Sequence, residues 1–169
     1  MTCVKVKRIG NHTLPLPRYE TEGAAGFDLR AHLKGHPRAV LMTHPDTGID
    51  TWCLHIRPQE HVEFPCGFAF EVPEGFELQV RPRSGMGRRE VLLWNGPGTV
   101  DSDYRGAVGL ALWNIPESSF LLWEGERVAQ GVIAPVARAE LVEVDTLSET
   151  ARGANGFGST GTGAGEVAP

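Results

Sequence analysis

The sequence lacks the features of membrane-spanning, disulfide-stabilised and nucleic-acid-binding proteins. No long apolar run is present in the N-terminal MTCVKVKRIG, so we expect neither a signal peptide nor a membrane span. The three cysteines are widely spaced and form no CxxC pair, which predicts free thiols in the cytoplasm rather than disulfides or a zinc site. A net charge of −5 argues against non-specific binding of nucleic acid, although a few arginines suffice to make a local pocket for a small anion.

Room for long helices is also missing, because 21 glycines and 12 prolines divide the 169 residues into short pieces. Gly- and Pro-containing turn signals recur at 65–67, 73–75 and 123–126, and a single short helical turn fits 86–93. Alternating or short apolar stretches between these signals are typical of strands. Strands are predicted at 4–9, 24–31, 76–81, 107–113, 128–134 and 139–144. The sequence therefore predicts one all-β domain, either a barrel or a jelly-roll-like sandwich.

The composition changes after Asp145, where glycine and small polar residues begin to dominate. Such a segment buries too little apolar surface to offset its ordering entropy, so a disordered terminus is one interpretation. That interpretation explains the glycines but not Arg152 and Phe157 among them. A cation, a ring, hydroxyls and bare amides favour a lid that becomes ordered on a ligand.

Polar residues interrupt the predicted strands in four other segments. Asp28 lies inside an apolar strand, where an exposed-face carboxylate is the simpler explanation. Arg83, Ser84 and Gly85 occupy a sharp turn and suit phosphate oxygens, although a plain decorated turn explains them equally well. Gln130 interrupts a buried run, so its amide needs partners from the backbone or from a ligand.

The segment 95–106, NGPGTVDSDYRG, is predicted to form a hairpin from its Gly and Pro content. It carries two aspartates, a tyrosine and an asparagine within a short distance. Aspartate is a poor strand residue, so DSDY indicates either a turn or a site of chemistry.

Taken together and in this order, five segments resemble the motifs of the trimeric dUTP pyrophosphatases (dUTPases). The segments are AAGFDLRA, PRSGMG, NGPGTVDSDYRG, ERVAQGVI and RGANGFGSTG. The resemblance implies a jelly-roll-like distorted barrel, the dUTPase-like β-clip, in a homotrimer with C-terminal arm exchange. It divides the chain into a core at 1–145 and a flexible arm at 146–169 that reaches a neighbouring subunit. Closed symmetry then supplies each of the three sites with an arm.

The activity that the resemblance implies is hydrolysis of dUTP to dUMP and pyrophosphate, assisted by Mg²⁺ on the triphosphate. This reaction limits uracil incorporation into DNA and supplies dUMP for thymidylate synthesis. Asp101 matches the carboxylate that aligns the attacking water and acts as general base. Asp28 matches an acidic position that contacts the magnesium through water.

Substrate-binding roles follow from the same match. Arg83, Ser84, Gly85 and Gln130 correspond to phosphate-binding positions. The uracil edge would contact Asn95 and the backbone of Gly98, Thr99 and Val100, while Tyr104 would pack on the deoxyribose and Gly109 would line the same pocket. In the arm, Phe157 would stack on the base, and Arg152, Gly158, Ser159 and Thr160 would close on the phosphates.

Two departures from the family pattern stand out. Asn155 replaces a usual glycine, and Asn tolerates a positive φ better than most residues. The spacing between Asp28 and Ser84 is long, so we expect an added β-hairpin at 34–52, turned by HPDTG. This insert is either a surface elaboration or a partner-binding element, which leaves a dUTPase-like regulatory protein as an alternative. A dCTP deaminase of related fold is the other alternative.

Overall fold

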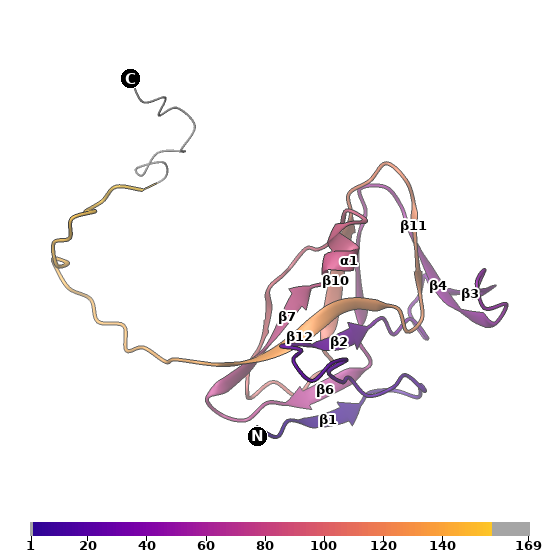
Figure 1. The fold of residues 1–169 in the computed structure, drawn as a ribbon, viewed down its shortest axis with the longest axis horizontal. Coiled ribbons are helices and arrows are strands. Elements are labelled where there is room, and N and C mark those ends of the chain that lie inside the picture. Colours follow the sequence, from indigo (N-terminus) through magenta and orange to yellow (C-terminus); the bar gives the residue numbers. More distant parts are fainter. Residues whose placement is uncertain (1, 157–169) are drawn as a thin grey trace. The chain divides into compact units, whose positions relative to one another are not determined.

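The computed structural model describes residues 2–156 (Figure 1), and the chain divides into two units. The first unit is Met1–Ala137 and the second is Arg138–Pro169. Each strand of the described residues belongs to the first unit. No helix in the described part of the chain is long and apolar enough to cross a membrane.

Short strands make up almost all of the regular structure. The strands are β1 (Lys5–Arg8), β2 (Phe27–Arg30), β3 (Val40–Thr43), β4 (Asp50–Ile56), β5 (His61–Pro65), β6 (Phe68–Glu71), β7 (Phe76–Pro82), β8 (Val91–Leu93), β9 (Gly98–Val100), β10 (Gly109–Asn114), β11 (Phe120–Trp123) and β12 (Arg127–Pro135). One turn of helix, α1 (Ser84–Gly87), lies between β7 and β8. The all-β prediction is therefore confirmed.

The strands form four antiparallel sheets, in the orders β1-β6, β5-β10-β8, β11-β4-β3 and β2-β12-β7-β9. Figure 1 shows β2, β12 and β7 side by side in the largest of them. In residues 2–156 no strand pairing joins the four sheets into a closed barrel, so the jelly-roll-like arrangement that was expected is present as four separately paired sheets. The predicted turns are present. In two of them Gly67 and Gly125 adopt positive φ angles of 81° and 79°, which glycine tolerates because it has no side chain.

One apolar cluster holds the sheets together. Alternation in β2 and β7 directs Phe27, Leu29, Leu78 and Val80 inward, each less than 10% exposed. Burying side chains of this size stabilises the fold by about 1.5–3 kcal/mol each. At Gly131 an added Cβ would lie 2.5 Å from the Phe27 ring, so the absence of a side chain there allows β12 to pack closely on β2.

The prediction of a strand at 139–144 is wrong for the structure of a single chain. In the structure these residues form no strand, and Leu141 and Val142 are 94% and 68% exposed. An alternating apolar pattern makes a segment fit for a sheet, but a strand also needs a partner for its hydrogen bonds. The first unit ends at Ala137, and the division into a core at 1–145 and an arm at 146–169 stays a prediction.

The two predictions of local turns had different outcomes. The helical turn exists, but it begins at Ser84, two residues before the predicted range, and ends at Gly87. The hairpin predicted for 95–106 is wrong, because β9 pairs with β7 while β10 pairs with β5 and β8. The strands β9 and β10 thus belong to different sheets, so 95–106 crosses between two sheets.

The hairpin expected within 34–52 is present as β3 and β4. Thr43 pairs with Asp50, and the amide of His44 donates to the carbonyl of Ile49 across the turn, at 2.9 Å. β4 also pairs with β11, so the hairpin extends a three-stranded sheet with β3 at its edge (Figure 1).

Candidate active site

A cavity of about 410 Å³ collects the residues predicted to recognise the base and sugar. It lies where β9 leaves β7, beside the outer face of β5 and β10. The predicted residues in its lining are Asn95, Gly98, Thr99, Val100, Asp101, Tyr104 and Gly109. Glu63, Trp94 and Ala111 line it as well and were not predicted.

Tyr104 is held in this cavity by its own turn. Its hydroxyl donates to the carbonyl of Ala107 at 3.1 Å, and its amide donates to the carbonyl of Asp101 at 3.2 Å. An added Cβ at Gly106 would lie only 2.3 Å from the Tyr104 hydroxyl oxygen. Gly106 therefore leaves the space that the tyrosine ring occupies.

Asp101 directly follows β9 and its side chain is exposed. The pairing of Val100 with Leu78 and of Thr99 with Gln79 anchors the backbone that carries it. Within residues 2–156, no ion pair holds the Asp101 carboxylate. A carboxylate on a fixed turn and open to solvent has the geometry required of a group that orients water.

A cluster of arginines lies at the ends of β2, β7 and β12. The Nε of Arg83 lies 2.8 Å from one oxygen of Asp28, and Nη1 of Arg127 lies 3.1 Å from the other. Arg83 also donates to the carbonyl of Arg127 at 3.0 Å. With a side chain only 12% exposed, Asp28 lies between two guanidiniums that arrive from distant parts of the chain.

A smaller cavity of about 250 Å³ opens beside this cluster. Arg83, Gly85, Arg89 and Arg127 line it, and Arg89 pairs with Glu126 at 2.8 Å. Ser84 begins the helical turn α1 next to it and is exposed. Three guanidiniums around one cavity make it suited to an anion with several oxygens, such as a phosphate group.

Sequence reasoning missed Arg89 and Arg127. Arg127 lies within the segment ERVAQGVI that indicated the family, three residues before Gln130. Its position in this segment could have identified it as a candidate phosphate-binding residue. Nothing in the local sequence distinguishes Arg89 from its neighbour Arg88. The amide of Gln130 has a backbone partner, since its Nε2 donates to the carbonyl of Pro82 at 3.0 Å.

The two cavities share no lining residue. The base-side residues around Asp101 and the phosphate-side residues around Arg83 are therefore grouped separately within one chain. Both groups are positioned by β7, which pairs with β9 on one side and with β12 on the other.

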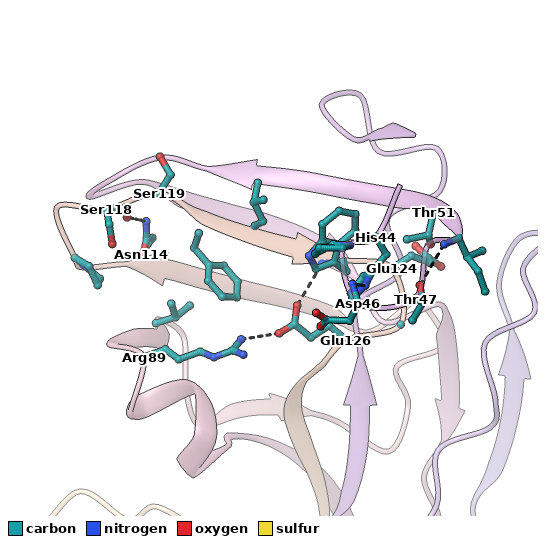
Figure 2. A pocket seen from close by; sticks show the side chains of 18 residues that line it. His44, Asp46, Thr47, Thr51, Arg89, Asn114, Ser118, Ser119, Glu124 and Glu126 are labelled. Carbon is teal, nitrogen blue, oxygen red and sulfur yellow. Dashed lines mark hydrogen bonds and ion pairs between the residues drawn. The ribbon is translucent and has the colours of Figure 1, made fainter. Parts of the chain in front are cut away.

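A third cavity, of about 820 Å³, is the largest of the three and holds none of the predicted site residues (Figure 2). The turn of the β3–β4 hairpin and strand β11 form its walls, with the rings of His44 and Trp123 packed 4.6 Å apart. Arg89 and Glu126 line both this cavity and the arginine cavity, and Figure 2 shows the two side chains facing each other.

The described residues contain no preformed metal-binding site. Among residues 2–156 no three His, Cys, Asp or Glu side chains are grouped as a metal would require. Both oxygens of Asp28 are already paired with arginines, and Glu126 is paired with Arg89. These donors fit an ion that is held by phosphate oxygens and water, with at most an indirect contact from Asp28.

The arm is described only as far as residue 156. Arg152 donates from Nε to the carbonyl of Asn155 at 3.0 Å, within a local turn. Gly153, and not Asn155, takes the positive φ, of 51°. The predicted contacts of Phe157, Gly158, Ser159 and Thr160 lie outside the described residues.

The fold and these cavities define a class of protein. Its sheets are antiparallel. One cavity is lined by the carboxylate of Asp101, which forms no ion pair among residues 2–156, and a second cavity is lined by three arginines. This arrangement is typical of an all-β protein that binds a small phosphorylated molecule.

The particular family follows from comparison with known proteins. The family model described as dUTPase matches residues 53–161. The chain is 50% identical over 149 residues to the deoxyuridine 5'-triphosphate nucleotidohydrolase of Rhizobium etli (strain CFN 42), covering 88% of this chain and 86% of that protein. This chain belongs to the dUTPase family, and the resemblance found in the sequence is confirmed.

Solved structures agree on the fold. A mutant dUTPase of Staphylococcus bacteriophage 80alpha with dUpNHpp aligns with a TM-score of 0.77 at 22% identity, over 95% of this chain and 99% of that one. A mutant dUTPase of phage phi11 of S. aureus, in which a structural Mg(II) ion is coordinated, aligns with a TM-score of 0.68 at 18% identity, over 87% and 99%.

Proposed function

We propose that this protein hydrolyses dUTP to dUMP and pyrophosphate. The observation that carries the proposal is the cavity in which Asn95, Tyr104 and Asp101 meet, since these are the groups that uracil, deoxyribose and the attacking water each require. Family membership and the activity named for the Rhizobium etli relative support the same reaction.

Asp101 orients and polarises the water that attacks the α-phosphorus. An aspartate is a weak base at neutral pH, so positioning contributes as much as proton transfer. Arg83, Ser84, Gly85 and Gln130 hold the phosphate oxygens, where donors fixed in advance stabilise the charge of the transition state. Asp28 keeps the guanidiniums of Arg83 and Arg127 in place for this task.

Uracil is selected by its pattern of acceptor, donor and acceptor along one edge. Asn95 and the backbone of Gly98, Thr99 and Val100 lie around the cavity and match this edge. Cytosine presents a donor in place of one acceptor and would leave buried groups unpaired, which is a large penalty. Tyr104 packs on the deoxyribose and leaves no space for a 2′-hydroxyl.

Asp28 would hold a magnesium ion on the triphosphate only through water, because its carboxylate is already paired with two arginines. The ion would supply neutralisation of phosphate charge, as in other phosphoryl-transfer sites.

The active protein is a homotrimer in which neighbouring chains complete each site. Support comes from the base-side and phosphate-side cavities, which share no residue within one chain. The exposed, strand-like segment 139–144 also lacks a partner in its own chain. The arm beyond it would bring Arg152 and Phe157 over the site of a neighbour. We place the reaction in the cytoplasm, where the three cysteines would stay free thiols.

Pyrophosphate release in the presence of magnesium, measured for dUTP, dTTP, dCTP and UTP, tests the proposed function. We expect turnover of dUTP and little of the other three. Equal turnover of dCTP or UTP would contradict the uracil pocket, and ammonia release from dCTP would indicate a deaminase instead.

The role of Asp101 has a separate test. Asp101→Asn keeps the size of the side chain and its exposed position, and we expect a loss of turnover of about 10²–10⁴-fold with nucleotide binding retained. Asp103→Asn, two residues away in the same turn, is the matched control. Wild-type turnover in the Asp101 variant would remove this residue from its proposed role.

A further inference from the structure

Trp94 lies in the base-side cavity next to Asn95, and none of the roles described above uses it. The cavity lining includes its side chain together with Gly98, Asp101 and Tyr104. In the isolated chain the tryptophan is 55% exposed. About half of this large residue is therefore open to solvent, among the residues predicted to bind the base.

The ring of Trp94 is held in place rather than free to move. Its backbone amide donates to the carbonyl of Ala111 at 3.0 Å, which ties the residue to β10. The ring packs against His61 with centroids 4.8 Å apart and planes at 62°. His61 in turn packs on Trp113, its cross-strand partner, at 5.1 Å. Two strands thus support the position of one exposed ring.

An exposed aromatic face inside a concave pocket is suited to a nucleobase. Ligand pockets are lined by apolar and aromatic side chains with a few polar groups that set orientation. Here Asn95, the next residue along the chain, lines the same cavity and supplies a polar group. Each nucleobase has an apolar face that packs on an aromatic side chain, while its edge remains free for hydrogen bonds.

We infer that Trp94 forms one wall of the base pocket and contributes directly to the binding of the uracil nucleotide. The inference rests on the proposed function and extends it by a residue of this chain outside the residues carried over from the family. The competing occupant of the exposed ring is a second copy of the chain, in which case Trp94 would belong to a subunit interface.

Trp94→Ala and Trp94→Phe test the inference, with Trp123→Phe as the matched control because Trp123 lines a different cavity. For Trp94→Ala we expect the KM for dUTP and the Kd for dUMP to rise by about 5- to 150-fold, the equivalent of the loss of one stacked base. The value of kcat should stay within about threefold, because the ring contacts the base and not the reacting phosphate. Trp94→Phe should show a smaller rise.

Tryptophan fluorescence provides a readout that does not depend on turnover. Titration with dUMP should change the emission of the wild type and of Trp123→Phe, and this change should vanish in Trp94→Phe. The same titration with dTMP, dCMP and dAMP shows whether the ring senses bases in general. The fluorescence of Trp94→Phe decides the question even if Trp94→Ala does not fold.

Two results would overturn the inference. One is a dUMP-induced emission change that persists undiminished in Trp94→Phe. The other is a loss of the oligomeric mass in either Trp94 variant with unchanged affinity for dUMP, which would assign the ring to a subunit interface. Failure of the proposed function has its own signature, since the wild type would then release no pyrophosphate from dUTP whatever its fluorescence shows.

Discussion

At the scale of single residues, several groups in this protein act by placing a neighbour. Asp28 was expected to contact a metal through water, yet its two oxygens hold Arg83 and Arg127 at 2.8 and 3.1 Å. Gly106 has no side chain to offer a ligand, but it leaves room for the ring of Tyr104. The chemical role of a residue is therefore read from its contacts as well as from its type.

Gly106→Ala should displace Tyr104 from the cavity, because the new methyl group would lie 2.3 Å from the tyrosine oxygen. We expect discrimination between dUTP and UTP, measured as the ratio of their kcat/KM values, to fall by about tenfold or more. Gly23→Ala is the control, since nothing lies within 4 Å of an added Cβ there. Unchanged discrimination in Gly106→Ala would show that Tyr104 does not exclude the 2′-hydroxyl.

The three cysteines should differ sharply in reactivity. Cys3 is exposed, whereas Cys53 and Cys66 are buried. Burial raises the pKa of the Cys66 thiol to about 11, and it also raises the pKa of Cys53. We expect a thiol reagent at pH 8 to modify one cysteine per folded chain and all three after unfolding. Cys3→Ser should abolish the fast reaction, and rapid loss of a second thiol from the folded chain would contradict the described packing.

At the scale of elements, the β3–β4 hairpin is joined to the sheet core by side chains as well as by strand pairing. Arg38, just before β3, donates to the carboxylate of Glu60 at 3.0 Å and to the carbonyl of His55 at 3.1 Å. Glu60 also accepts the amide of Arg57 at 2.7 Å. That backbone hydrogen bond, followed by the contact with Arg38, holds the pKa of Glu60 below its usual value.

A lowered pKa in the folded state means that ionised Glu60 stabilises the fold above its unfolded pKa, and that this contribution is lost as the pH falls through the folded pKa. Glu60→Gln should therefore lower the Tm by about 2 °C at pH 7. The difference from wild type should shrink towards zero at acidic pH, below the folded pKa, where the wild-type carboxyl is protonated. Glu74→Gln, at an exposed turn, should change the Tm at neither pH. An equal effect at both pH values would assign the loss to packing instead.

At the scale of the whole molecule, the compact unit of one chain leaves two things incomplete. The base-side and phosphate-side cavities are separate, and the segment 139–144 has no strand partner among residues 2–156. Both are explained if copies of the chain assemble and exchange this segment, because closed symmetry supplies the missing partner to every copy.

Two truncations separate assembly from closure of the site. Removal of the chain after Thr150 keeps 139–144 and should leave a folded oligomer whose turnover falls by about 10²-fold or more, since the phosphates lose the closing arm. Removal after Ala137 deletes the strand-like segment as well and should weaken the oligomer. Mass measurement in solution with pyrophosphate release checks both. If the shorter deletion already dissociates the oligomer, the arm is required for assembly and is more than a lid.

Local features were predictable from the sequence: apolar patterns and turn residues predicted β2, β7 and β12, because strand character and turn geometry depend on neighbours along the chain. Motif order indicated the family, and the spacing between two of its motifs, with the turn HPDTG, predicted the β3–β4 hairpin. Which strands pair depended on the folded chain, in which β9 joins β7 and 139–144 pairs with no strand of residues 2–156. It also decided that Asp28 meets Arg127 and that Trp94 opens into the base-side cavity. Such contacts join residues far apart in sequence, and no pattern of adjacent residues encodes them.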